Sequence, residues 1–256
     1  MNNPITQEAI KAYLPPWLGD MEIAVFDTVD STNSEARRRI ESGHNRPMII
    51  AANAQTAGRG RRGRSFYSPA YTGLYMSIVI HPHSDFDGTV YIMTAAAVAV
   101  AKALERVAGV SAGIKWVNDI FVGERKVCGI LAESVFDQSS GSIKSVIIGI
   151  GVNVTTCDFP EDIADTAGAA GVETDRSRLA AAITEAWFET EADRSTYLDE
   201  YRRRSIVIGR RVRCMHNNES FCAEAVDIDE RGGLIIRRDN GTTETLSSGE
   251  VSLRLE

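Results

Sequence analysis

The sequence predicts an α+β protein in two parts, with a helix-and-sheet domain over residues 1–204 and a small β-barrel over residues 205–256. In the first part, short apolar runs typical of buried strands alternate with segments whose apolar residues recur at helical spacing. In the second part, turn residues interrupt strand-like runs roughly every 8 to 12 positions, the pattern of a small barrel. A chain of 256 residues is long enough for one large domain and a small one.

The segment around residue 30 carries the signals of a helix start. Residues 30–33 (Asp-Ser-Thr-Asn) are all N-cap candidates, and Thr32 followed by Glu35 fits a capping box. We therefore predict a helix from this point to Gly43.

Apolar runs and helical periodicity place the other elements of the first part. The alanine-rich segment at 89–108 is predicted to be a buried helix that Gly109 ends. Gly123, Glu124 and Arg125 are predicted to form a hairpin turn between two strands. The remaining predicted elements are strands at 48–52, 73–80, 113–122, 126–135 and 144–154, and a helix at 175–204.

Composition describes an acidic globular protein and argues against several classes. The formal net charge is −7, whereas domains that coat nucleic acid tend to be basic, so no DNA partner is expected. The N-terminus lacks a basic segment followed by an apolar run. The most apolar stretch, 90–104, is shorter than the roughly 20 residues needed to cross a bilayer. The lack of these two segments predicts no membrane partner. The four cysteines have no CxxC spacing, which is typical of reduced thiols, so we expect a cytoplasmic protein.

Residues 58–64 (Gly-Arg-Gly-Arg-Arg-Gly-Arg) bring four guanidinium groups and three glycines together. Cations this close repel one another, so an anion is the expected reason for the cluster, and the glycines let the backbone approach it. The spacing also fits a GxGxxG turn and, with arginine for lysine, a P-loop, but both of these must open onto a helix. Here a strand follows, and the chain has no HRD or DFG element to support a kinase loop. The segment is predicted to bind phosphate in another context.

A second polar cluster lies in the predicted hairpin. Lys115, Asn118 and Asp119 precede the turn and Lys126 follows it, so strand pairing can aim all four at a single pocket. A solvated lysine at a turn is the alternative for Lys126. Its place in an apolar strand that contains Gly129, opposite an Asn-Asp pair, favours the pocket.

Six short motifs follow one another along the chain. They are STN at 31–33, QTAGRGRRGR at 55–64, KWVND at 115–119, RKVCGIL at 125–131, GIGVN at 149–153 and GEVSLR at 249–254. In this order they resemble the motifs of the biotin–protein ligases, over residues 27–254. Val117 stands where that family usually has proline, and the loss of a fixed φ is expected to change affinity and leave the type of reaction intact. Roughly 25 residues precede the first motif, too few for the helix-turn-helix domain of members that repress transcription, so the enzyme-only form is expected.

The resemblance implies a fold and a reaction. The fold is a mixed β-sheet flanked by helices, similar to class II aminoacyl-tRNA synthetases, with a C-terminal SH3-like barrel. The reaction is that of a biotin–[acetyl-CoA-carboxylase] ligase: biotin and ATP, carried with Mg²⁺, give biotinyl-5′-AMP, and a lysine of a biotin carboxyl carrier protein takes the biotinyl group. A homodimer is expected by analogy. Because a carboxylate is ionised at neutral pH, this chemistry needs cations and no base-activated nucleophile.

The resemblance also implies residue roles, position by position. The expected catalytic residues are Lys126, Arg59 and Asp119, with Asp119 also near Mg²⁺. The expected biotin-binding residues are Ser31, Thr32, Asn33, Gln55, Arg59, Gly60, Arg61, Lys126 and Gly129. The expected nucleotide-binding residues are Arg61, Arg62, Arg64, Lys115, Trp116, Asn118, Asn153 and Arg254. Plain structural alternatives are a helix cap for Asn33, solvated loop cations for Arg62 and Arg64, a core side chain for Trp116 and a surface position for Arg254.

Mobility of the arginine loop is a further expectation. A glycine-rich loop of mutually repelling arginines should move when empty, so residues 58–70 are predicted to order over the adenylate and shield it from water.

Two alternative functions are open. The first is a lipoate–protein ligase or octanoyl transferase of the same superfamily; because octanoyltransferases use a cysteine nucleophile, Cys128 is the residue to test. The second is a nucleic-acid binder that uses the arginines as a phosphate clamp. The net charge of −7 and the absence of aromatic residues within the arginine run disfavour it.

Overall fold

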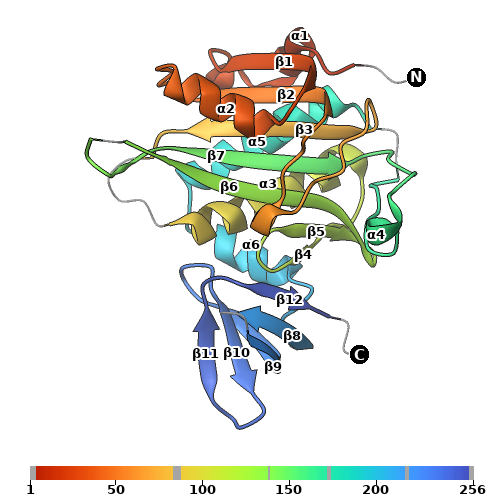
Figure 1. The fold of residues 1–256 in the computed structure, drawn as a ribbon, viewed down its shortest axis with the longest axis vertical. Helices are drawn as coiled ribbons and strands as arrows, with labels where there is room; N and C mark the ends of the chain where they lie inside the picture. Colours follow the sequence, from red (N-terminus) through yellow and green to blue (C-terminus); the bar gives the residue numbers. More distant parts are fainter. Residues whose placement is uncertain (1–3, 83–87, 138, 172–173, 217–218, 254–256) are drawn as a thin grey trace.

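The computed structural model describes residues 4–82, 88–137, 139–171, 174–216 and 219–253. A seven-stranded mixed sheet forms the upper part of the molecule in Figure 1, and a five-stranded sheet formed by the C-terminal residues lies below it. The predicted class, an α+β protein with a mixed sheet flanked by helices, is confirmed.

The elements follow the predicted order closely. The large sheet contains β1 (Glu22–Val29), β2 (Met48–Gln55), β3 (Gly73–Ile80), β4 (Gly113–Lys115), β5 (Asp119–Val122), β6 (Arg125–Phe136) and β7 (Ile143–Asn153). The small sheet contains β8 (Arg211–His216), β9 (Glu219–Ile228), β10 (Leu234–Arg238), β11 (Thr243–Leu246) and β12 (Glu250–Ser252). The helices are α1 (Gln7–Tyr13), α2 (Thr32–Glu41), α3 (Thr89–Ala108), α4 (Glu161–Ala164), α5 (Arg176–Ala192) and α6 (Tyr197–Arg204), with short 3-10 turns at Pro16–Leu18 and Arg61–Gly63.

The large sheet has the strand order β1-β2-β3-β7-β6-β5-β4. β1 and β2 are parallel, and the other neighbouring pairs of the described strands are antiparallel. β7 lies between β3 and β6, so Gly151 has Tyr75 on one side and Gly129 on the other. The RKVCGIL and GIGVN motifs, which lie on the consecutive strands β6 and β7, thereby become neighbours at the centre of the sheet.

Different helices cover the two faces of the sheet. α3 and α5 pack on one face, and α2 packs on the other, where Ala36 and Ile40 contact Val79 and Ile147 in a smaller apolar cluster (Figure 1). α3 is buried as predicted, and its many alanines let it lie close to the sheet and to α5. No described helix, α3 included, is both long and apolar enough to cross a bilayer.

The single helix predicted at 175–204 is wrong, because the structure divides it into α5 and α6. α5 begins after Asp175, whose carboxylate accepts hydrogen bonds from backbone N–H groups of the first turn. It ends where the Asp193 carboxylate accepts a hydrogen bond from the backbone N–H of Ser195 at 3.0 Å. Asp and Ser side chains compete with helical hydrogen bonds in this way, which separates the two helices.

The strand predicted at 113–122 is also divided, by a turn at 116–118 between β4 and β5. Asn118 holds this turn against β6: its Nδ2 donates to the carbonyl of Ile130 at 2.8 Å, and its own carbonyl accepts from the Ile130 N–H at 3.1 Å. The predicted hairpin is confirmed for β5 and β6, which pair antiparallel across a turn that contains Gly123 at φ +59°.

The small sheet has the order β11-β10-β9-β8-β12, with antiparallel neighbours throughout its described strands. Between described residues no pairing joins β11 to β12, so the predicted closed barrel is corrected to an open sheet, consistent with an SH3-like domain. Both edge strands are short, with four and three residues, which leaves little backbone to close the sheet. The domain boundary at 204/205 falls between α6 and β8 and stays a prediction.

Candidate active site

A cavity lies on the sheet face that α2 covers, at the point where β7 changes from bulky residues to glycine. Alternate residues of a strand face the same side, so Ile147, Gly149 and Gly151 share this face. Ile147 packs in the core beneath α2, whereas the two glycines line an open space. The space inside the cavity and its open mouth amounts to about 920 Å³.

Most residues that the motifs single out line this one cavity. Residues from α2, β2, the arginine loop, the 116–118 turn and β6 meet there although they lie far apart in the sequence. The predicted site residues that line it are Ser31, Thr32, Asn33, Gln55, Arg59, Gly60, Arg61, Arg64, Lys115, Trp116, Asn118, Asp119, Lys126 and Gly129.

Three predicted nucleotide-binding residues are not among the lining residues. Arg62 is exposed and has a left-handed backbone with φ +55°. Asn153 is buried, and its Nδ2 donates to the carbonyl of Gly168 at 3.0 Å. Arg254 lies outside the residues that the structure describes. Their roles stay predictions.

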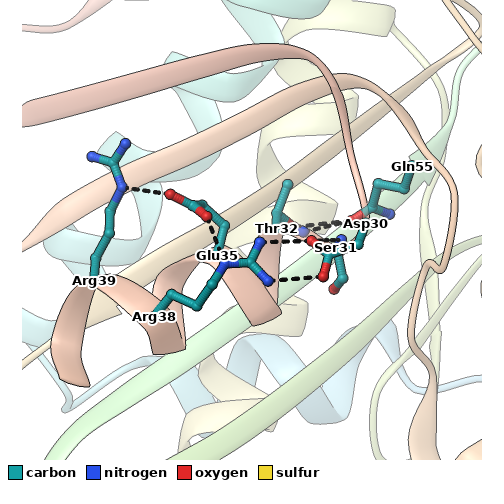
Figure 2. A network of polar contacts seen from close by, with 7 residues as sticks. All are labelled: Asp30, Ser31, Thr32, Glu35, Arg38, Arg39 and Gln55. Atoms are coloured by element: carbon teal, nitrogen blue, oxygen red, sulfur yellow. Dashed lines mark hydrogen bonds and ion pairs between the residues drawn. The ribbon is translucent and has the colours of Figure 1, made fainter. Parts of the chain in front are cut away.

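Hydroxyl and amide groups form one end of the cavity, at the start of α2. The Gln55 Oε1 accepts from the backbone N–H of Thr32 at 2.8 Å and lies 3.3 Å from its hydroxyl (Figure 2). The Gln55 Nε2 donates to Ser68 Oγ at 2.9 Å, which ties this end to the arginine loop. Ser77, a buried residue of β3, has its Oγ 2.8 Å from Thr32 Oγ1. Such groups can match the donors and acceptors of a neutral polar ring.

The predicted capping box at Thr32 is wrong. Ser31 is the N-cap residue and makes no side-chain capping bond, whereas Thr32 occupies the first helical position. Glu35 does not reach back to the cap; its carboxylate pairs with Arg38 at 2.9 Å and Arg39 at 3.0 Å (Figure 2). Local sequence placed the helix start correctly, but the Thr32 side chain turns toward Gln55 and Ser77.

Asn33 is also not a helix cap. Its Nδ2 donates to Glu133 Oε2 at 2.7 Å, and its Oδ1 lies 2.6 Å from Ser77 Oγ. A Cβ at Gly149 would lie 2.2 Å from the same Oδ1, so only glycine at that position leaves room for the amide. Asn33 therefore connects α2 to both β6 and β3.

The arginine loop folds over the cavity as a compact turn. The Gly60 N–H donates to the Arg64 carbonyl at 2.7 Å, and the Phe66 N–H donates to the Gly58 carbonyl at 2.9 Å. The Phe66 ring lies over Gly151, where an added Cβ would approach it to 2.5 Å. The loop thus places backbone and guanidinium groups over the glycine surface of β7.

Arg59 and Arg61 of the loop contact partners from other elements. Arg59 Nη2 lies 2.9 Å from Glu133 Oε1. Arg61 donates from Nη1 to Asn118 Oδ1 at 2.8 Å and from Nη2 to the Gly249 carbonyl at 3.2 Å. Burial lowers the pKa of the Arg61 guanidinium, and the nearby Asp119 carboxylate opposes that shift.

The small sheet also contributes to the mouth of the cavity. Arg64 Nη2 lies 2.9 Å from Glu250 Oε2, and the Gly249 carbonyl accepts from Arg61. The indole N–H of Trp116 donates to the Gly232 carbonyl at 2.9 Å. Trp116 is a buried core residue that also lines the cavity, so the core alternative is confirmed and its role toward a nucleotide stays a prediction.

Lysine and aspartate side chains form another part of the cavity wall. Lys126 Nζ lies 2.6 Å from Asp119 Oδ1, and Lys115 Nζ lies 3.8 Å from Asp119 Oδ2. Burial lowers the pKa of Lys115, Asp119 raises it and the Lys126 ammonium lowers it further. Strand pairing in the β4–β5–β6 meander brings these groups together, as the sequence predicted.

The cavity is locally cationic in an acidic protein. Five of its lining side chains are cationic and two are carboxylates, whereas the whole chain has a net charge of −7. This arrangement attracts anions and stabilises negative charge that develops on phosphate oxygens. The lining cations are Arg59, Arg61, Arg64, Lys115 and Lys126, and the lining carboxylates are Asp119 and Glu250.

Cys128 does not face this site as a reactive thiol. It is fully buried in the main core, and burial raises its pKa far above the usual value. A nucleophilic cysteine requires the opposite shift, toward the thiolate.

No metal cluster is formed by the described side chains: none of their His, Cys, Asp and Glu residues gather in groups of three or more that could hold an ion. Asp119 is the carboxylate predicted to lie near Mg²⁺, and two ammonium groups already contact it. These residues would suit a Mg²⁺ ion that binds together with the phosphates of ATP better than an ion held by protein side chains alone.

Sequence reasoning missed four contributors to the site. Ser77 had a usable signal, since it is the one polar side chain other than a tyrosine within the apolar run 73–80. Glu133 lies in a run of half-buried residues, 131–134, where a carboxylate gives no local sign of its partners. Phe66 and the Gly249 carbonyl reach the site only through tertiary contacts.

Two protein families match this chain. Residues 25–153 match the Biotin/lipoate A/B protein ligase family, and residues 207–254 match the Biotin protein ligase C terminal domain. The fold and these matches define a protein ligase, and the chain belongs to the biotin/lipoate A/B protein ligase family.

Individual relatives point to the biotin branch of the family. The bifunctional ligase/repressor BirA of Bacillus subtilis is 31% identical, and the match covers 95% of this chain and 78% of that protein. Biotin--[acetyl-CoA-carboxylase] ligase of Mycobacterium tuberculosis is 29% identical, with 91% and 89% covered. The biotin protein ligase from Aquifex aeolicus in complex with biotin and ATP superposes with a TM-score of 0.76 at 27% identity, covering 92% of this chain and 99% of that one.

Proposed function

We propose that this chain activates biotin with ATP as biotinyl-5′-AMP and transfers the biotinyl group to a lysine of a biotin carboxyl carrier protein. The observation that carries the proposal is the cavity's two-sided chemistry. Hydroxyl and amide groups of Thr32 and Gln55 lie at one end, and Arg59, Arg61 and Lys126 surround the remainder. A ligand with a neutral polar ring and a carboxylate fits this division.

In the first step, a carboxylate oxygen of biotin attacks the α-phosphorus of ATP. A new P–O bond forms, the bond to the β-phosphate oxygen breaks, and pyrophosphate leaves. Arg59 and Arg61 offset the repulsion between the two anions, and Lys126 stabilises charge on the mixed anhydride. Mg²⁺ is expected to neutralise phosphate charge, near Asp119.

In the second step, the acceptor lysine amine attacks the acyl carbon of the adenylate. An amide bond forms, the bond to the phosphate oxygen breaks, and AMP leaves while the amine loses a proton. Closure of the arginine loop and its Phe66 over the glycines would exclude water, which otherwise hydrolyses the anhydride.

The nearest alternative is a ligase or transferase for lipoate or octanoate. Burial of Cys128 argues against the cysteine-dependent transferase, and the named relatives support biotin as the acyl group. A homodimer stays a prediction.

The decisive experiment incubates the chain with Mg-ATP, a carrier-domain fragment and either biotin, lipoate or octanoate, and measures the mass of the carrier. A gain of one biotinyl group, dependent on ATP, is expected. A gain only with lipoate or octanoate would overturn the proposal in favour of the alternative.

A further inference from the structure

Glu133 of β6 contacts two residues that line the cavity, Arg59 and Asn33, although Glu133 is not itself a lining residue. Its two oxygens contact nitrogen atoms of different elements: Oε1 forms an ion pair with Arg59 Nη2 in the loop at 2.9 Å, and Oε2 accepts a hydrogen bond from Asn33 Nδ2 in α2 at 2.7 Å. Arg37 Nη2 lies further away, at 3.8 Å. The Glu133 side chain is only 15% exposed, so water competes weakly for these contacts.

These contacts belong to a polar chain that begins and ends on the arginine loop. It starts at Arg59, passes through Glu133 to Asn33, and returns to the loop through side chains around the hydroxyl and amide end of the cavity. The later members are Ser77 (2.6 Å from Asn33), Thr32 (2.8 Å from Ser77), Gln55 (2.8 Å from the Thr32 N–H), Ser68 (2.9 Å from Gln55) and the Phe66 carbonyl (2.9 Å from Ser68).

The chemistry of the two partners requires a carboxylate at position 133. A guanidinium has donors only, and the Asn33 atom that faces Glu133 is the amide nitrogen. Both atoms of residue 133 must therefore accept. Glutamine offers one acceptor and one donor, so one contact would become a donor facing a donor. Aspartate offers two acceptors but is one methylene shorter.

We propose that Glu133 is a positioning residue that orients the Asn33 amide and the Arg59 guanidinium together, and so couples the biotin end of the cavity to the arginine loop. The assignment of the two ends to biotin and phosphate rests on the proposed function. The ion pair with Glu133 uses one guanidinium nitrogen of Arg59, Nη2. Arg59 also lines the cavity, so its other N–H groups can meet an anion.

The test compares Glu133→Gln with a double variant that also carries Asn33→Asp. The double variant reverses polarity: the introduced amide nitrogen donates to the introduced carboxylate, and the amide oxygen faces the Arg59 guanidinium. The second carboxylate oxygen can accept from Ser77, as Asn33 Oδ1 does. The summed charge of residues 33 and 133 is the same in the double variant as in the wild type. A recovery of biotin affinity would therefore depend on the arrangement of donors and acceptors and not on charge.

Binding of biotin alone, measured by calorimetry, is the first readout. Glu133→Gln is expected to weaken biotin about tenfold or more, and the double variant to bind biotin at least about threefold more tightly than Glu133→Gln. Glu224→Gln removes a carboxylate from another arginine pair, 2.7 Å from Arg237, and should leave binding unchanged. An unaltered affinity in Glu133→Gln, or a double variant no better than the single one, would overturn the proposal.

Hydrogen exchange of residues 58–68 in the ligand-free chain is the second readout. This measurement needs no substrate, so it tests the inference separately from the proposed function. A wild-type protein that binds no biotin would contradict the proposed function, but the role of Glu133 could still be tested by exchange. Faster exchange of the loop in Glu133→Gln, recovered in the double variant and absent in Glu224→Gln, is expected. Equal exchange in wild type and Glu133→Gln would refute the coupling.

Discussion

Lys126 and Asp119 form an ion pair with 2.6 Å between Nζ and Oδ1, on the wall of the cavity. Lys115 approaches the same carboxylate to 3.8 Å from the neighbouring strand. One carboxylate therefore orders two ammonium groups and offsets their mutual repulsion. Groups ordered in this way need little rearrangement when a phosphate arrives, which is the condition for effective electrostatic stabilisation.

Lys126→Ala should slow adenylate formation roughly ten- to a hundredfold, because a hydrogen bond to a charged group contributes about 1.5–3 kcal/mol. Single-turnover release of pyrophosphate measures this step directly. Lys144→Ala is the matched control, since Lys144 is exposed on β7, donates from Nζ to the Ile40 carbonyl at 3.4 Å and is not a lining residue of the cavity. A Lys126→Ala rate within a few-fold of wild type would contradict the assigned role.

The arginine loop should lose mobility when biotin and ATP bind together. Its arginines repel one another, and an anionic ligand between them removes that repulsion. Hydrogen exchange over residues 58–70 should slow markedly with both ligands present, while the buried strand at 144–154 changes little. Equal exchange rates in the loop with and without ligands would show that it is already closed.

Gly149→Ala should weaken biotin binding about tenfold or more, because the new Cβ would approach Asn33 Oδ1 to 2.2 Å and displace the amide. Calorimetric titration with biotin measures the loss. Asn33→Ala serves as the partner in a double-mutant cycle: once the amide is displaced, removing it should cost little more, so the two losses should not add. Fully additive losses would mean that Gly149 acts without Asn33.

Cys128→Ala should keep ligase activity within a few-fold of wild type, because the thiol is buried and its pKa is raised by burial. Iodoacetamide should modify the exposed Cys157 before Cys128 in the folded protein, as peptide mass mapping can follow. Activity that disappears in step with alkylation of Cys128 would favour the cysteine-dependent transferase.

Glu200→Gln should lower the free energy of unfolding at pH 7 by about 1–3 kcal/mol. Glu200 pairs with Arg203 and with the buried Arg204, both at 2.7 Å, and these hydrogen bonds lower its pKa from 4.5 to about 2 against an opposing effect of burial. The unfolded state therefore takes up a proton first. The stabilisation is complete above pH 4.5 and is lost as the pH falls toward 2.

Denaturant unfolding at a series of pH values measures this dependence. The wild type should lose more stability than Glu200→Gln between about pH 4.5 and 2. Glu224→Gln, at an exposed arginine pair, is the control and should behave like wild type. If the free energy of unfolding fell equally with pH in the wild type and in Glu200→Gln, the contacts of Glu200 with Arg203 and Arg204 could not be the cause of the pH dependence.

Much of the fold could be predicted because its signals are local. The strand at 73–80 and the helix at 89–108 match β3 and α3 residue for residue, since a long apolar run or helical period outweighs competing preferences. The division of the predicted helix at 193–196 could not be foreseen from periodicity. It depends on side-chain bonds such as that of Asp193 to the Ser195 N–H.

The candidate site divides in a similar way. The arginine loop and the lysine hairpin were predictable because each gathers its charges within a few residues. The partners of those charges were not: Glu133 reaches Arg59 across more than seventy positions, and the Gly249 carbonyl reaches Arg61 from the small sheet. Those pairings exist only after strands distant in sequence have become neighbours.

By itself, the sequence determined which chemical groups this protein has for binding anions, and in which order they follow along the chain. Only the tertiary structure decided that they share one cavity and that Ser77, Glu133 and Asn33 link its two ends. The physical reason is that local sequence sets backbone preference, whereas the register between β3, β7 and β6 sets which side chains meet.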